Sequence, residues 1–203
     1  MKMARLVFIC LAAAFLLACS DAGLSPREGF IEVEGGKVWY QIVGSGNATP
    51  LLLLHGGPGA PSYYLKPLDK VAVDRPIIFY DQLGAGRSPA PADRDLWTVE
   101  RFVKELGQVR TALGLEEVHI LGHSWGSMLA MDYMLTEPEG VRSLIFASPA
   151  LNVTRWAEDA RRLLRVLPEE TQALIERHQN EGTTDTPEYQ EAVMDYYKIY
   201  LSR

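Results

Sequence analysis

The sequence predicts an α/β fold in which helices cover both faces of a doubly wound, mostly parallel sheet, and three observations support this prediction. Short, continuous apolar runs recur along the chain, as is typical of strands that are buried on both faces. Segments with helical periodicity separate these runs, and two of the runs end in glycine-rich turns. With 203 residues, 47% of them hydrophobic, the chain is long enough for one domain with a substantial core.

The first part of the sheet is expected to be a hairpin followed by two buried strands. The hairpin would comprise residues 30–33 and 37–43, which flank a pair of glycines. Apolar runs at 51–54 and 76–80 predict two strands that are buried on both faces, with a helix between them at 62–73.

The second part of the sheet alternates helices and strands more clearly. Thr98 precedes a segment whose apolar residues share one helical face, and Gly114 ends it. A strand at 118–121, a helix at 128–135 and a strand at 141–147 follow. This alternation is the main support for a doubly wound sheet.

The pattern changes after residue 149, where strand signals stop. Residues 156–167, 168–180 and 187–201 each predict a helix, and they are rich in Glu, Arg and Tyr. These helices could form a subdomain that carries no site, or they could cover one. The tyrosines of the last helix fit both interpretations, since they could line a pocket or, as is more common, pack between helices.

Ser124 lies in the pentapeptide Gly-His-Ser-Trp-Gly, between the strand at 118–121 and the helix that follows. A serine between two glycines at such a junction can occupy a sharp, strained turn that raises its hydroxyl clear of the sheet. A hydroxyl in that position can act as a nucleophile once a base removes its proton.

A second glycine-rich turn, His55-Gly56-Gly57-Pro58-Gly59, ends the apolar run at 51–54. Its backbone N–H groups are not masked by side chains, so one of them can stabilise a developing oxyanion. The partner N–H group would come from Trp125, the residue after the serine. A plain Gly-Pro turn at the end of a buried strand is the alternative interpretation.

A third segment, Asp81-Gln82-Leu83-Gly84-Ala85-Gly86-Arg87-Ser88, completes a pattern that resembles the proline iminopeptidase family of the α/β-hydrolase fold. The resemblance runs from about Gly29 to the end of the chain. It implies that Ser124 is the nucleophile and that the N–H groups of Gly57 and Trp125 form the oxyanion hole. The family usually has an arginine where this chain has Leu83, so strict specificity for proline does not follow.

The resemblance also implies a division of the chain. Residues 29–150 would form the amino-terminal part of the α/β-hydrolase core, and residues 151–203 would form part of a helical cap over the active site. In the family, glutamates in and after the cap hold the free amino terminus of the substrate. The sequence does not assign them to positions in this chain.

The acid and the base of a catalytic triad are not found where this fold requires them. They should follow the serine on loops after later strands, and no strand pattern follows residue 147. The only later histidine, His178, lies on a polar helix face, where we expect a solvated surface residue. Asp132 and Asp159 fall within predicted helices. We therefore expect the sheet to be incomplete at its carboxy-terminal side, in a piece of a complete hydrolase that ends within the cap.

Residues 1–18 predict a lipoprotein signal peptide. A positively charged start and an apolar stretch too short to span a bilayer end in Leu16-Leu17-Ala18-Cys19. Cys19 would carry the lipid anchor, and residues 19–28 would form a tether. Ser20 favours the outer membrane of a bacterial cell envelope, with the protein facing the periplasm. The alternative is an ordinary signal peptide or an uncleaved anchor.

Composition argues against several other classes of protein. The formal net charge is −6 and no basic cluster occurs, so we expect no nucleic-acid partner. The only cysteines are Cys10 and Cys19, and no Cys/His cluster exists, so we expect no metal site. The predicted chemistry also needs no cofactor. The sequence does not indicate an oligomeric state.

The leading hypothesis is a serine hydrolase that releases an amino-terminal residue, preferably proline, from a short peptide or amino-acid amide through an acyl-enzyme. An esterase or lactonase of the same fold is one alternative, because fold does not determine the leaving group. A catalytically incomplete lipoprotein that binds a peptide or partner is another. Related dehalogenases and epoxide hydrolases use Asp as the nucleophile, so Ser124 argues against both.

Overall fold

The computed structural model describes residues 24–149 and 151–200. The predicted signal peptide and Cys19 lie outside this part of the chain. The first strand begins at Arg27, so the last two residues of the predicted tether, 27 and 28, belong to the sheet.

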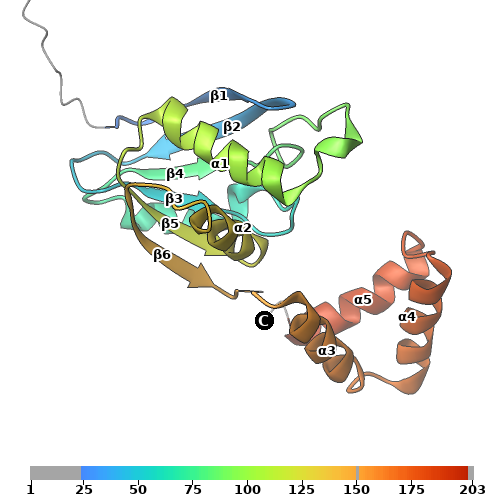
Figure 1. The fold of residues 1–203 in the computed structure, drawn as a ribbon. Helices are drawn as coiled ribbons and strands as arrows, with labels where there is room; N and C mark the ends of the chain where they lie inside the picture. The colour runs from blue at the N-terminus through green and yellow to red at the C-terminus, as the bar shows by residue number, and fades with distance from the viewer. Residues whose placement is uncertain (1–23, 150, 201–203) are drawn as a thin grey trace, which may run out of the picture.

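One six-stranded sheet organises the molecule (Figure 1). Its strands are β1 (Arg27–Val33), β2 (Gly36–Val43), β3 (Leu51–Leu54), β4 (Ile77–Tyr80), β5 (Val118–His123) and β6 (Val141–Ala147). They lie in the order β1-β2-β4-β3-β5-β6. The hairpin β1–β2 and the pair β2–β4 are antiparallel, and β4, β3, β5 and β6 are parallel. The predicted hairpin and the mostly parallel sheet are thus confirmed.

The register between β3 and β5 decides where the two glycine-rich turns lie. Leu54, the last residue of β3, pairs with Gly122 in β5. Since the carboxyl ends of parallel strands meet at one edge of a sheet, the turn at 55–59 and the turn at 122–126 leave that edge side by side.

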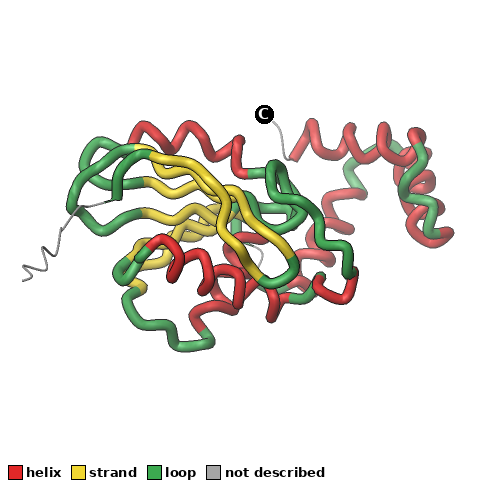
Figure 2. Tube along the Cα trace, turned by 90° about the horizontal axis from the view of Figure 1, so that it is seen from above, coloured by secondary structure: helices red, strands yellow, loops and turns green. Residues whose placement is uncertain are grey.

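Helices cover both faces of the sheet, as Figure 2 shows in a view along it. The helix α1 (Val99–Leu113) and the helix α2 (Trp125–Met134) lie on one face, and the 3₁₀ helix η1 (Ser62–Val71) lies on the other. A short 3₁₀ turn, η2 (Arg94–Leu96), precedes α1. The Thr98 hydroxyl accepts a hydrogen bond from the Arg101 N–H, and Gly114 closes the helix in the left-handed conformation, as the sequence predicts for both ends of α1.

The central strands β3 and β4 are buried on both faces, which explains their continuous apolar runs. Leu52 and Ile78 pack beneath α1 and α2, whereas Leu53 and Phe79 pack against η1. Alternate residues of one run therefore serve two cores.

Residues 153–200 form three helices, α3 (Val153–Leu164), α4 (Glu169–Glu181) and α5 (Pro187–Tyr200), which Figure 1 shows beyond the end of β6. Leu167, Ile175 and Ala192 are the buried centre of this group. Among the described residues no helix is both long enough and apolar enough to cross a membrane.

The expectation that His178 is a solvated surface residue is wrong. His178 is only 6% exposed, and its Nδ1 forms a hydrogen bond of 2.7 Å with the Thr183 hydroxyl. Its ring also packs edge-on against Tyr189. The polar pattern of α4 is misleading here because the turn after the helix folds back over the imidazole and satisfies it.

Candidate active site

Ser124 occupies the tight turn between β5 and α2. Its backbone has φ 52° and ψ −117°, a conformation that is rare for a residue with a side chain. The Ser124 N–H donates to the Ala147 carbonyl of β6 at 3.0 Å, and its carbonyl accepts from the Ser127 N–H at 2.9 Å. The side chain is partly exposed rather than buried in the interior. This geometry is the one that the pentapeptide motif predicts.

The two glycines of the motif are required by close backbone contacts. A Cβ atom on Gly122 would collide with the carbonyl of Gly126, one turn further along the chain. A Cβ atom on Gly126 would collide with the carbonyl of Leu54, at the end of β3. Glycine at these positions lets α2 begin directly against the neighbouring strand.

The turn at 55–59 packs against the serine. A Cβ atom on Gly56 would lie 3.2 Å from the Cβ of Ser124, so the two turns are in contact. Gly57 has a φ of +119°, and a side chain there would collide with the backbone N–H of Gly59. Gly57 is exposed, so its surroundings leave room for a substrate. The structure therefore places the turn that carries Gly57 against Ser124, whose successor is Trp125, the third residue that the sequence predicts for the site.

His55 is a buried structural residue of this turn. The Gln82 N–H donates to its Nε2 at 2.8 Å, so Nε2 carries no proton and Nδ1 donates to the Gly56 carbonyl at 2.9 Å. Burial lowers the pKa of His55, although the bond to Gly56 and the charge of Asp81 oppose this shift. The imidazole is thus neutral and committed to its own loop.

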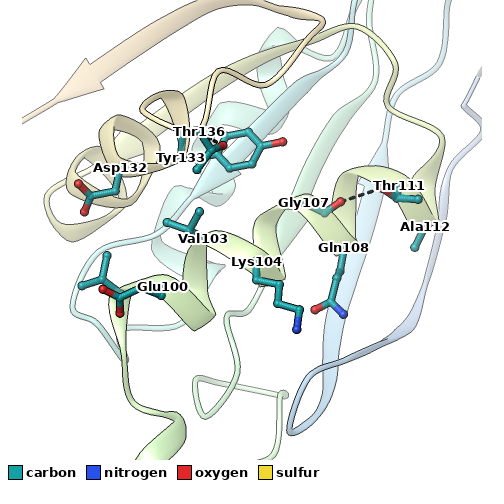
Figure 3. A pocket seen from close by; sticks show the side chains of 11 residues that line it. Glu100, Val103, Lys104, Gly107, Gln108, Thr111, Ala112, Asp132, Tyr133 and Thr136 are labelled. Carbon is teal, nitrogen blue, oxygen red and sulfur yellow. Dashed lines mark hydrogen bonds between the residues drawn. The ribbon is translucent and has the colours of Figure 1, made fainter.

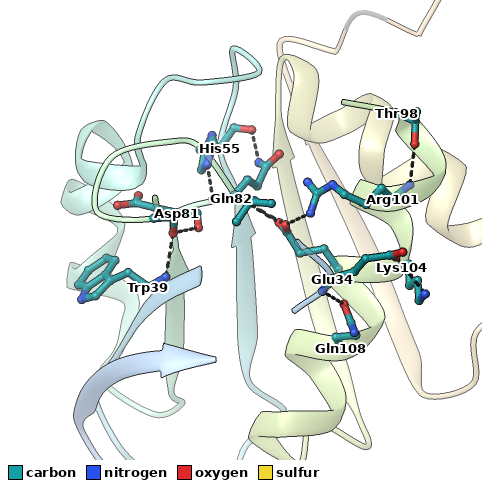
Figure 4. Close-up of polar contacts among 12 residues, drawn as sticks. Glu34, Trp39, His55, Asp81, Gln82, Thr98, Arg101, Lys104 and Gln108 are labelled. Carbon is teal, nitrogen blue, oxygen red and sulfur yellow. Dashed lines mark hydrogen bonds and ion pairs between the residues drawn. The ribbon is translucent and has the colours of Figure 1, made fainter. Parts of the chain in front are cut away.

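Gln82 joins the two turns through its side chain. Its side-chain amide donates to the His55 carbonyl at 3.1 Å (Figure 4). Its Oε1 accepts a hydrogen bond from the Trp125 indole Nε1–H at 2.9 Å. Gln82 is 1% exposed, so both contacts are shielded from water.

The segment 81–88 fixes the loops around Gln82. The Asp81 carboxylate accepts hydrogen bonds from the backbone N–H groups of Ser62 and Arg87, at 2.7 and 2.9 Å. The Ser88 hydroxyl donates to the Asp81 carbonyl at 2.5 Å and accepts from the Trp39 N–H at 2.8 Å. The motif residues Asp81 and Ser88 thus attach this segment to η1 and to β2.

Leu83, where the chain departs from the pattern it resembles, belongs to the core. It is 2% exposed and packs in the cluster beneath the β1–β2 hairpin. Its N–H points at the Glu105 carboxylate, with distances of 3.3 and 3.4 Å to the two oxygens. An apolar side chain suits this position because its surroundings are apolar.

None of the four histidines is placed as a base for Ser124. His55 is committed to its loop, His119 contacts the Ser143 hydroxyl, His123 contacts the Tyr64 hydroxyl, and His178 lies in α4. Within residues 24–149 and 151–200 no hydrogen bond joins the Ser124 hydroxyl to any side chain. Asp132 and Asp159 lie within α2 and α3, as expected. The described residues therefore place Ser124 beside the glycine-rich turn at 55–59 and place no histidine as its base.

Two cavities of the molecule lie away from Ser124. A cavity of about 1060 Å³ lies between α1 and α2, and Figure 3 shows Val103, Lys104 and Tyr133 among the side chains around it. Another, of about 340 Å³, lies among the helices α3–α5 and is lined by Tyr189, Tyr196 and Tyr197. The tyrosines of α5 thus pack together and also line a hollow. Among the described residues no cluster of three potential metal ligands occurs.

Sequence analysis missed two residues that shape the site, Tyr64 and Gln82. Tyr64 lies on η1, and its hydroxyl accepts a hydrogen bond from the Gly56 N–H at 2.6 Å. Gln82 stands within a motif that carried the family resemblance, but no spacing rule connects it to Trp125. The contact of Tyr64 with Gly56 and that of Gln82 with Trp125 both depend on how β3, β4 and β5 pair in space. The sequence does not specify this pairing.

Comparisons with known proteins agree with this geometry. A family model described as alpha/beta hydrolase fold matches residues 49–188. Curated proline iminopeptidases from Heyndrickxia coagulans and Clostridium botulinum are 50% and 43% identical to this chain over 177 and 173 residues. These alignments cover 87% and 83% of this chain but 62% and 59% of the relatives, so the chain spans about three fifths of their length.

Solved structures give the same result. The crystal structure of proline iminopeptidase from Mycobacterium smegmatis superposes with a TM-score of 0.73 and 34% sequence identity, covering 86% of this chain and 61% of that one. The crystal structure of VinJ superposes with a TM-score of 0.80 and 32% identity, covering 87% of this chain and 62% of that one.

Proposed function

Because the chain belongs to the α/β-hydrolase fold family, we propose that it carries the nucleophile and oxyanion hole of a serine hydrolase. Its reaction would release an amino-terminal residue, preferably proline, from a short peptide or an amino-acid amide. The contact between the turn at 55–59 and the strained turn at Ser124 carries this proposal. The curated relatives, which are named proline iminopeptidases, support the choice of substrate.

The proposed reaction proceeds through an acyl-enzyme. The Ser124 oxygen attacks the carbonyl carbon next to the scissile bond, and its proton passes to a base. The N–H groups of Gly57 and Trp125 stabilise the oxyanion that develops on the carbonyl oxygen. When the C–N bond breaks, the base returns the proton to the leaving amine, and water then hydrolyses the ester on Ser124.

The base and its orienting acid would come from residues outside these 203. The four histidines in the chain are engaged elsewhere, and a serine without a base retains only residual activity. We also propose that the protein is anchored by Cys19 in the bacterial cell envelope. This second proposal rests on the sequence alone.

The test is an assay of the full-length protein on proline and alanine arylamides and on short acyl esters. We expect the proline arylamide to give the highest kcat/KM, and Ser124→Ala to lower it by about 10⁴-fold or more. Ser45→Ala, which removes an exposed hydroxyl on a loop, is the matched control and should leave the rate unchanged.

Two outcomes would replace the proposal. Faster cleavage of the esters than of the arylamides would indicate an esterase or lactonase. A wild-type protein with no activity on either substrate class would indicate a protein that only binds its ligand.

A further inference from the structure

We propose that Gln82 and Tyr64 are positioning residues that set the distance between the two oxyanion donors, the N–H groups of Gly57 and Trp125. This inference rests on the proposed acyl-transfer function. Each side chain connects the turn at 55–59 with the turn around Ser124, and the two connections come from different elements of the fold.

Gln82 makes the first connection. It follows β4, and it contacts His55 twice, through its own N–H to Nε2 (2.8 Å) and through its side-chain amide to the His55 carbonyl (3.1 Å). Its Oε1 then accepts from the Trp125 indole (2.9 Å). One buried side chain thus connects the residue two positions before Gly57 with the residue that carries the other donor.

Tyr64 makes the second connection, from η1. Its hydroxyl accepts from the Gly56 N–H at 2.6 Å and forms a hydrogen bond of 2.8 Å with Nδ1 of His123. The rings of Tyr64 and His123 also pack edge-on, with centroids 5.2 Å apart. The two connections together tie both chain neighbours of Ser124, His123 and Trp125, to the two residues that precede Gly57.

These side chains matter because the main chain does not hold the two turns together. The ladder between β3 and β5 ends with the pair Leu54 and Gly122. Within the described part of the chain no main-chain hydrogen bond joins residues 55–59 to residues 122–126. A loop rich in glycine has many accessible conformations, so its position depends on such external contacts. An oxyanion hole acts only when both donors already point at the same oxygen.

The test compares Gln82→Met and Tyr64→Phe, alone and combined, in the full-length protein. Gln82→Met keeps the length of the side chain and removes its polar atoms, and Tyr64→Phe removes one oxygen. Gln41→Met and Tyr63→Phe are the matched controls, since Gln41 bonds only the exposed Lys66 and Tyr63 is exposed. All rates are corrected for the fraction of folded protein, measured by thermal unfolding.

Two readouts distinguish positioning from general structural support. The first is the split between kcat and KM on the proline arylamide. Each single variant should lower kcat by about 10- to 100-fold and leave KM within about twofold, since losing one donor outright costs about 10²- to 10³-fold. The second is phosphonylation of Ser124 by an alkyl fluorophosphonate, in which the hydroxyl proton passes to the base, the Ser124 oxygen bonds to phosphorus and fluoride leaves. Its rate constant should fall in parallel, because the phosphoryl oxygen occupies the same hole.

Several results would overturn the inference. Unchanged kcat and phosphonylation rates in both variants would do so, as would a raised KM with an unchanged kcat. If Gln82→Met does not fold, Tyr64→Phe alone decides. A wild-type protein that reacts with the fluorophosphonate but does not cleave arylamides would refute the proposed peptidase activity alone, and the phosphonylation rates would still test the positioning role. A folded wild-type protein that does not react at all would refute both.

Discussion

At the scale of single residues, the site depends on a strained serine that its surroundings hold in place. A non-glycine residue in such a conformation costs about 1–3 kcal/mol and persists only when neighbouring contacts determine it. Here those contacts are the Ser124 bonds to Ala147 and Ser127 and the close approach of α2 to β3. Gly122 and Gly126, two residues before and two residues after Ser124, allow the close backbone contacts that hold this strained conformation.

We therefore expect Gly126→Ala to be harmful although Ala favours helices. The added methyl group would collide with the Leu54 carbonyl and push α2 away from β3, which should cost about 1–3 kcal/mol of unfolding free energy and most of the activity. Gly107→Ala is the control, because a Cβ atom there meets only Tyr133 at 3.9 Å. It should stabilise the protein by up to about 1 kcal/mol. Urea denaturation measures the unfolding free energy of both variants. An unchanged unfolding free energy in Gly126→Ala would contradict the close contact between Gly126 and the Leu54 carbonyl.

The residues of the candidate site could be found from the sequence to different degrees. Ser124, Gly57 and Trp125 follow from local motifs, because a turn that requires glycine leaves a recognisable pattern in the sequence. Tyr64 and Gln82 act through contacts between segments 59 and 43 residues apart, and local patterns do not encode such contacts. The burial of His178 was missed for a different reason: the turn directly after α4 folds back over the imidazole, and the polar pattern of the helix does not reveal this.

At the scale of elements, α1 presents a buried ion pair to an otherwise apolar core. Arg101 and Glu105 are 3% and 0% exposed and 2.6 Å apart, one helical turn from each other. Burial raises the pKa of Glu105, and the charge of Arg101 and the Leu83 N–H oppose this shift. Since Leu83 follows Gln82, this pair also supports the loop on which the site depends (Figure 4).

Removing one partner of the Arg101–Glu105 pair should lower the unfolding free energy strongly, whereas replacing both residues together should not. Glu105→Leu leaves the Arg101 charge buried without a partner, which should cost about 3–5 kcal/mol of unfolding free energy. The double variant Arg101→Met with Glu105→Leu should recover most of that loss. Asp159→Leu is the control, because it breaks the exposed pair of the same spacing on α3, Arg155–Asp159, and also the exposed Arg162–Asp159 pair. The side chains of Arg155, Asp159 and Arg162 are 81%, 47% and 69% exposed, so this variant should cost at most about 1 kcal/mol. If denaturation curves show equal effects for the two pairs, the Arg101–Glu105 pair is not buried as described.

The elements themselves were largely predictable, with differences at their ends. The strand at 141–147 and the helix that begins after Thr98 match the structure, because strong periodicity and a capping residue define them. The strand predicted at 118–121 extends to His123, and α2 begins at Trp125 rather than residue 128. Glycines usually interrupt helices and strands. Here Gly122 lies within β5 and Gly126 within α2, where they allow the two elements to approach closely. The predicted helix at 62–73 is a 3₁₀ helix, and Pro67 lies within it.

At the scale of the whole molecule, the described chain presents the proposed nucleophile, Ser124, on a sheet whose last strand has one unpaired edge. β6 pairs only with β5, and its Ile145 and Phe146 are 44% and 36% exposed. The sequence predicted this edge, since no strand pattern follows residue 147. The fold family was predictable because three motifs occur in one order. The lipid anchor at Cys19 lies outside the described residues and stays a prediction.

The most direct test of the account is to identify the residue that a fluorophosphonate modifies in the full-length protein. Digestion and mass spectrometry of the labelled protein should place one adduct on Ser124, and Ser124→Ala should abolish it. The strained turn and the two flanking N–H groups would then form a working site for acyl transfer. An adduct on another serine, or no adduct on the folded protein, would contradict the assignment of Ser124 as the nucleophile.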